Sequence, residues 1–101
     1  MGLIFYGITG RNSALWGCTS TSFLCVKSPA QRTPPTNSGG VSNQCDGSIS
    51  LDWLAYLATH PNALGQPFSA GDVVNAQCWY RDPPSCKTTN LSDAIEWVTV
   101  P

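Results

Sequence analysis

The sequence is poor in ionic side chains, and that scarcity excludes several classes of protein. Only 11% of its 101 residues are Asp, Glu, Lys or Arg, against about 25% in an average soluble protein. A formal net charge of −1 provides no basic field for nucleic acid or an anionic membrane surface. No stretch approaches the roughly 18 consecutive apolar residues that a membrane-spanning helix needs. Nucleic acid and membrane insertion are therefore not expected, and a surface of uncharged polar residues suits an extracellular β domain.

Histidine is also scarce, which weakens the case for an enzyme or a zinc site. The only one is His60, in a Thr-His-Pro-Asn segment that is typical of a surface turn. No GxSxG motif is present, although a nucleophilic mechanism needs a base held beside a Ser or Cys. A structural zinc site needs a full set of Cys and His ligands at characteristic spacings, which this sequence does not offer. We therefore predict that the protein is not an enzyme and carries no catalytic residue, metal site or cofactor.

The six acidic residues permit two weaker hypotheses. A pair of carboxylates could hydrolyse a glycoside, but most of these acids occupy turn or cap positions, where Asp is favoured by local hydrogen bonds. Calcium needs about six or more oxygen ligands, and Asp46-Gly47 and Asn90–Asp93 could supply some of them. No EF-hand pattern accompanies these residues. A structural calcium ion is therefore a minor hypothesis beside ordinary turn formation.

Cysteine, in contrast, is well represented and indicates an oxidising compartment. Because no CxxC is present, disulfides explain the cysteines better than metal binding does, with small buried hydrophobes as the alternative. One odd thiol and two bridges leave about fifteen pairing schemes. A thiol left over would serve for packing or for an intermolecular bond, so the oligomeric state stays open. The cysteines are Cys18, Cys25, Cys45, Cys78 and Cys86.

The N-terminal sequence shows no basic region and no cleavage site of a signal peptide, since Met1-Gly2 leads directly into Leu3-Ile4-Phe5. An oxidised domain without an export signal is expected to be a part of a longer secreted protein. We therefore interpret residues 1–101 as a single domain cut from such a protein.

Hydrophobic patterning predicts short strands separated by turns. Arg11–Thr21 is predicted as a loop, with Leu15 and Trp16 folding back onto the core, and Leu54–Thr59 as a helical turn. Ser28–Gly47 is predicted to be irregular, and a bridge across it would add about 3 kcal/mol in the chain-entropy model. We predict an all-β, disulfide-stabilised antiparallel β-sandwich of jelly-roll type with long irregular loops. The predicted strands are Leu3–Ile8, Ser22–Lys27, Ser48–Trp53, Asp72–Arg81 and Ser92–Val100.

Several of these segments together resemble a C-terminal domain found in many large secreted proteins of planctomycetes and related marine bacteria. The resemblance covers nearly the whole chain, and WYRDP and NLSDA are its specific motifs. It implies an all-β extracellular accessory module without catalytic residues, and it favours pairing Cys25 with Cys45. Cys18, Cys78 and Cys86 look like additions to the family pattern; a second bridge is assigned to Cys78 and Cys86, and the connectivity of these three cysteines stays open. The segments are Gly2–Gly7, Phe23–Val26 with Cys45–Ser48, and Gln77–Pro83 followed by Thr88–Ala94.

Four tryptophans also suggest sugar binding, because sugar rings present apolar faces that stack on aromatic rings. Trp53 and Trp97 share strand faces with Ile and Leu and are predicted to belong to the core. Trp79 is the best candidate for an exposed ring, and Trp16 in its loop is the second. Arg81 is interpreted first as a structural partner of a neighbouring carboxylate and second as a ligand contact. The predicted ligand-binding set is Trp79, Trp16, Gln77, Asn75 and Arg81.

From these observations we expect a non-catalytic extracellular accessory module that serves attachment, assembly or interaction. A carbohydrate-binding module that uses exposed aromatic residues is the alternative. The expected partner is a glycan or another component of a cell surface.

Overall fold

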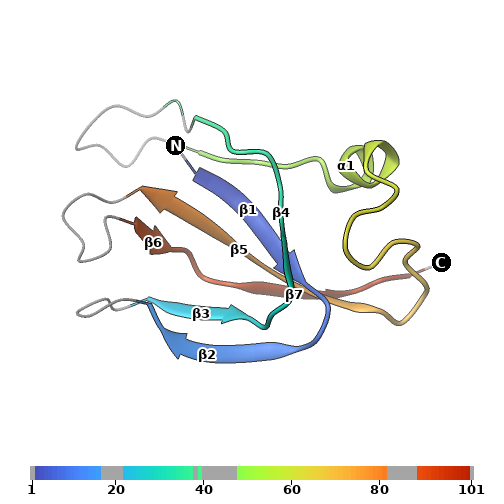
Figure 1. Cartoon of the computed structure of the whole chain (residues 1–101), viewed down its shortest axis with the longest axis horizontal. Helices are drawn as coiled ribbons and strands as arrows, with labels where there is room; N and C mark the ends of the chain where they lie inside the picture. The colour runs from blue at the N-terminus through green and yellow to red at the C-terminus, as the bar shows by residue number, and fades with distance from the viewer. Residues whose placement is uncertain (1, 17–21, 38, 40–47, 82–88, 101) are drawn as a thin grey trace.

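The computed structural model describes residues 2–16, 22–37, 39, 48–81 and 89–100 (Figure 1). Within these residues every strand pairing is antiparallel, so the predicted mostly β, antiparallel class is confirmed. The finer jelly-roll-like sandwich stays a prediction. No helix in the described part is long and apolar enough to cross a membrane. The elements are β1 (Gly2–Gly7), β2 (Arg11–Leu15), β3 (Phe23–Val26), β4 (Ala30–Arg32), α1 (Trp53–Thr59), β5 (Val73–Arg81), β6 (Thr89–Leu91) and β7 (Ile95–Val98).

The two long strands β1 and β5 form the centre of a five-stranded sheet. Its order is β4-β1-β5-β6, and β7 pairs with the first half of β5 while β6 pairs with the second half. The strand predicted over Ser92–Val100 is present as the shorter β7, whereas β6 before it was not predicted. Between β6 and β7 the chain steps from one half of β5 to the other. At the step, Ser92 bonds to Cys78 of β5 through its backbone N–H (2.9 Å) and its hydroxyl (2.8 Å).

One face of this sheet carries the larger core cluster. Tyr6 of β1 and Val74 and Ala76 of β5 are buried there beneath Tyr56 of α1. The hydroxyl of Tyr6 donates a hydrogen bond to the carbonyl oxygen of Leu64 at 2.7 Å, and burial raises the pKa of Tyr6 to about 12. The loop after α1 is thereby fixed against the sheet.

Helix α1 replaces part of a predicted strand. The alternation in Ser48–Trp53 predicted a half-buried strand, but 48–52 form none and Trp53 is the first helical residue. The reason is local, because the Asp52 carboxylate caps the helix by accepting a hydrogen bond from Ala55 N at 3.1 Å. The predicted helical turn over Leu54–Thr59 and the core position of Trp53 are confirmed.

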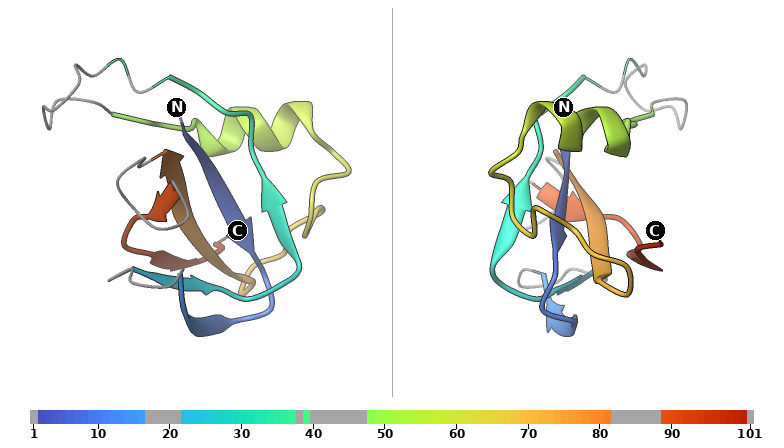
Figure 2. Two further views of the ribbon diagram at one scale, coloured as in Figure 1. Left: turned by 60° about the vertical axis from the view of Figure 1, so that its left-hand side comes forward. Right: turned by 90° about the vertical axis from the view of Figure 1, so that its right-hand side faces the viewer.

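The opposite face is covered by β2 and β3, which pair as a separate two-stranded sheet and are called the hairpin below. In both views of Figure 2, α1 lies at the top and the hairpin at the bottom. Gly7 allows β3 to approach the sheet closely, because a Cβ there would lie 2.8 Å from the Val26 side chain. Val26 is accordingly buried and packs with Phe5 and Leu91.

The strand β2 corrects the prediction of a loop over Arg11–Thr21. Its side chains are all exposed and its pairing with β3 shifts register between Arg11 and Ala14, so no hydrophobic alternation marks it in the sequence. Leu15 is 55% exposed, contrary to prediction. Trp16 packs against the cluster on the hairpin face, as predicted.

Candidate functional site

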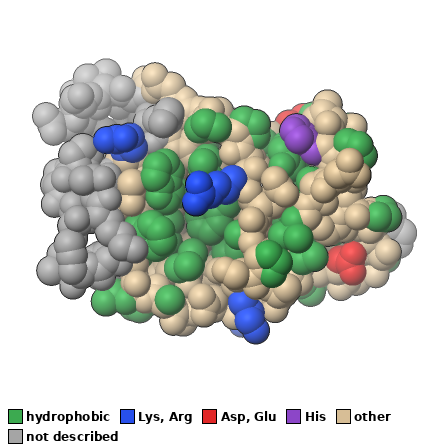
Figure 3. Space-filling model, in the orientation of Figure 1, with side chains coloured by type: hydrophobic (Ala, Val, Ile, Leu, Met, Phe, Trp, Pro, Cys, Tyr) green, Lys and Arg blue, Asp and Glu red, His purple; other side chains and the backbone are tan. Residues whose placement is uncertain are grey.

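An apolar pocket between the sheet and the hairpin is the strongest candidate site. Its volume is about 250 Å³. Hydrophobic side chains gather at the surface between β4 and β3, and a basic side chain lies beside them (Figure 3). The lining residues are Leu3, Phe5, Trp16, Leu24, Ala30, Arg32, Trp79 and Leu91.

Strand register builds the floor of the pocket. Leu3 and Phe5 are two residues apart on β1 and therefore project to the same face of the sheet. Phe5 lies opposite Arg32 of β4, and Leu3 lies opposite Trp79 of β5. Trp79 in turn lies opposite Leu91 of β6. Neighbouring rows of cross-strand partners thus form a continuous floor of aromatic and aliphatic side chains.

The hairpin supplies the opposite wall, through Leu24 of β3 and Trp16 just after β2. The indole N–H of Trp16 donates to the hydroxyl of Thr89 at 3.4 Å, and its backbone N–H donates to the carbonyl oxygen of Ser22 at 3.1 Å. These bonds tie the Trp16 side chain to the sheet side of the pocket and its backbone to the β3 side.

A buried glutamine holds the hairpin over the sheet. The side-chain oxygen of Gln77 accepts a hydrogen bond from Cys25 N at 2.8 Å. Its NH₂ group donates to the carbonyl oxygens of Phe23 and Ser92, each at 2.8 Å. One side chain of β5 therefore satisfies backbone groups of β3 and of the segment after β6. These hydrogen bonds fix the distance between the hairpin and the sheet at the pocket.

Arg32 is the only charged residue among the described residues that line the pocket. It is exposed, and it makes no side-chain hydrogen bond or ion pair with any residue that the structure describes. The sequence did not reveal it, because β4 is only three residues long and lies inside the stretch Ser28–Gly47 that was predicted to be irregular.

The structure brings together two of the five predicted ligand-binding residues. Trp16 and Trp79 both line the pocket, whereas Arg81 is exposed at the end of β5 and does not. Asn75 and Gln77 are each only 3% exposed, so they are not the exposed amides that were expected beside Trp79. Alternation placed both on the face of Trp79, but the hairpin covers that face and the two amides serve internal hydrogen bonds.

The cysteines also differ from the prediction. Cys25 and Cys78 carry free thiols, so the predicted disulfides at these two positions are absent from the structure. They cannot pair with each other across the sheet, because alternation turns Cys78 away from the hairpin face to which Gln77 points. Burial raises the pKa of the Cys78 thiol, which disfavours the thiolate form. The other three cysteines, Cys18, Cys45 and Cys86, lie outside the described residues.

The histidine and two of the described acids that carried the catalytic and calcium hypotheses are engaged in structural contacts. His60 stacks on Tyr56 with ring centroids 4.1 Å apart, and its Nδ1 lies 2.9 Å from the Tyr56 carbonyl oxygen at the end of α1. Asp52 caps α1, and Asp72 accepts a hydrogen bond from Ser69 N at 2.8 Å. Among the described residues no group of three or more His, Cys, Asp or Glu could hold a metal ion. Asp46 of the calcium hypothesis lies outside them.

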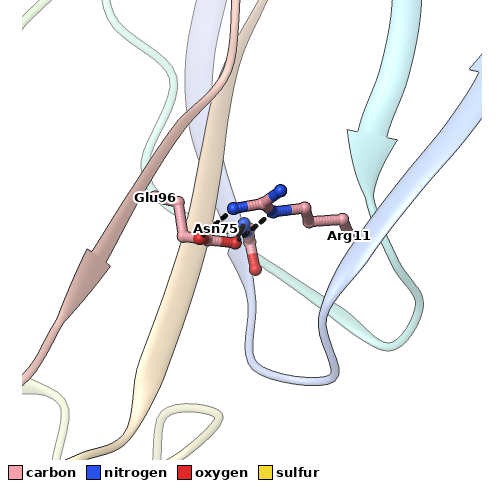
Figure 4. A network of polar contacts seen from close by, with 3 residues as sticks. All are labelled: Arg11, Asn75 and Glu96. Atoms are coloured by element: carbon pink, nitrogen blue, oxygen red, sulfur yellow. Dashed lines mark hydrogen bonds and ion pairs between the residues drawn. The ribbon is translucent and has the colours of Figure 1, made fainter.

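A surface ion pair joins the hairpin to the far edge of the sheet. Arg11 of β2 donates two hydrogen bonds to the Glu96 carboxylate of β7, at 2.8 and 2.7 Å (Figure 4). Asn75 donates a third, at 2.8 Å. The hydrogen bonds from Arg11 and then Asn75 lower the pKa of Glu96 from the ordinary carboxyl value of 4.5 to about 2.

This lowered pKa predicts a loss of stability in acid. The pair stabilises the fold above pH 4.5. Its contribution disappears as the pH falls from 4.5 towards 2, because the unfolded chain then takes up a proton at Glu96 while the carboxylate of the folded state stays ionised. Urea unfolding at pH 7 and pH 3 should show a smaller acid destabilisation for Glu96→Gln than for the unmodified protein. Lys27→Gln is the control and should behave as the unmodified protein does. Equal acid destabilisation in all three proteins would contradict the prediction.

Comparison with known proteins gives no relative, because no family model, no curated protein and no solved structure matches the chain. The resemblance based on WYRDP and NLSDA therefore stays a prediction.

Proposed function

We propose that the chain is a non-catalytic binding module, an accessory domain of an extracellular protein, and that its binding site is the pocket beneath the hairpin. The observation that carries the proposal is the convergence of Trp16 and Trp79 on one cavity. Binding sites for small molecules are typically concave and mostly apolar, with a few polar groups that orient the ligand. The pocket has this composition.

The pocket supports an apolar ligand better than a sugar. The carbohydrate-binding alternative retains its two indole rings, which could stack on a sugar face. It also needs amides that hydrogen-bond the sugar hydroxyls, and those of Asn75 and Gln77 are buried in internal bonds. We therefore place the carbohydrate alternative second.

The extracellular part of the proposal rests on the sequence. A surface of few charges and a set of five cysteines support export, and a glycan or another cell-surface component remains the proposed partner of the whole accessory module. A jelly-roll-like sandwich belongs to the same proposal, whereas bridges at Cys25 and Cys78 do not, because both thiols are free.

The neutral probe 1-octanol tests whether the pocket binds. In NMR titrations we expect it to shift the indole N–H signals of Trp16 and Trp79 and to leave those of Trp53 and Trp97 in place. Ala30→Phe should weaken binding at least about tenfold, because the added ring occupies space that the ligand needs, equivalent to a loss of about 1.4 kcal/mol.

Ala14→Phe is the matched control, since Ala14 is exposed on β2 and does not line the pocket. It should bind 1-octanol as the unmodified protein does. Equal shifts at all four indoles, or unchanged binding by Ala30→Phe, would count against the pocket as the site.

A further inference from the structure

We infer that the pocket selects an organic anion, an amphipathic carboxylate of about eight carbons in all. This inference rests on the proposed function and adds the chemical class of the ligand. Three properties of the pocket support it, which are the position of its one described charge, the apolar composition of its walls and its volume.

The charge comes from Arg32. A guanidinium presents several N–H donors in a planar fork that can bind a carboxylate through two parallel hydrogen bonds. Arg32 is available for such a bond, because its side chain has no partner among the described residues. No acidic residue in the described lining competes for it. Within its described lining the pocket therefore offers one cation and no counter-charge.

The walls determine what accompanies the carboxylate. Arg32 lies on the edge strand β4, directly opposite Phe5 of β1, so the charge stands at one side of the floor. Leu3, Trp79 and Leu91 continue the floor away from it. Inorganic anions would find a single side-chain cation beside apolar walls, whereas an amphipathic anion would match both the charge and the walls.

The volume sets the size of the apolar body. An engineered apolar cavity of about 150 Å³ in another protein holds benzene, and a water-sized group occupies about 30 Å³ in a liquid. The pocket of about 250 Å³ therefore accommodates roughly eight such groups. Octanoate is accordingly the probe that fits, and 1-octanol is its neutral counterpart.

The test compares these two probes by isothermal titration and by the indole signals of Trp16 and Trp79. In Arg32→Gln, octanoate should bind about three- to tenfold more weakly, a range that allows for an exposed cation. Binding of 1-octanol should stay within about twofold. Added salt should weaken octanoate and leave 1-octanol unchanged, because screening acts only on the charged probe.

Arg81→Gln is the matched control, since Arg81 has the same exposed guanidinium and does not line the pocket. It should leave both probes unaffected. If Arg32→Gln weakens both probes equally or neither, the anion inference is overturned while the pocket still binds. If neither probe shifts Trp16 and Trp79, the proposed function fails together with the inference.

Discussion

Replacing Gln77 with alanine is expected to lower the free energy of unfolding by about 3–5 kcal/mol. The change removes the partner of Cys25 N and of the carbonyl oxygens of Phe23 and Ser92. Each buried polar group left without a partner costs about 1–3 kcal/mol, and water reaching the gap offsets part of that cost. The free energy of unfolding of a domain of this size is only about 5–15 kcal/mol, so the expected loss is a large fraction of the total.

The measurement is urea unfolding followed by tryptophan fluorescence. Asn12→Ala is the control, because Asn12 also carries an amide and lies on the hairpin, but its side chain is exposed. It should change the stability by less than about 0.5 kcal/mol. Amide hydrogen exchange at Cys25 should accelerate in Gln77→Ala, since its N–H loses its acceptor. A destabilisation by Gln77→Ala as small as that of Asn12→Ala would refute the proposed role of the glutamine.

The same change should weaken 1-octanol binding, because Gln77 sets the position of the wall that contains Leu24. Stability and binding are thus coupled on the hairpin face. The sequence predicted the strand and face of Gln77 correctly from the alternation in Asp72–Arg81. It could not predict burial, since alternation does not show whether another part of the chain covers that face.

The candidate site shows the same limit: single residues of the site could be predicted from the sequence, but contacts between distant segments could not. Trp16 and Trp79 could be nominated one by one, because bulky aromatics are informative wherever they occur. Their convergence depends on the docking of the hairpin, which is a contact between distant segments. Arg32 could not be found, because a three-residue edge strand has no measurable period.

The strand predicted over Ser48–Trp53 failed for a different reason. Its alternation is genuine in the sequence, and Leu51 and Trp53 do pack against the core. Two signals overlapped at Asp52, which is a polar residue within an alternating segment and also the cap of α1. The cap and the helix formers that follow it decided the local structure.

Replacing Trp53 with alanine is expected to cost about 3–5 kcal/mol of stability, the range for truncating a large aromatic in a core. The indole ring is the centre of an aromatic group on the α1 face. Its centroid lies 4.9 Å from that of Tyr6, 5.3 Å from Trp97 and 5.7 Å from Phe68. Removing it leaves a cavity that these rings can refill only in part.

Leu54→Ala provides the matched control, since Leu54 is the next residue of α1 and is 76% exposed. Its stability change should stay within about 0.5 kcal/mol. Under native conditions Trp53→Ala should still bind 1-octanol, because α1 and the pocket lie on opposite faces of the sheet. Gln77→Ala and Trp53→Ala are therefore expected to destabilise the fold similarly while only the first impairs binding. Loss of binding in both variants would mean that the two faces are not independent, and the pocket could not then be assigned to the hairpin face alone.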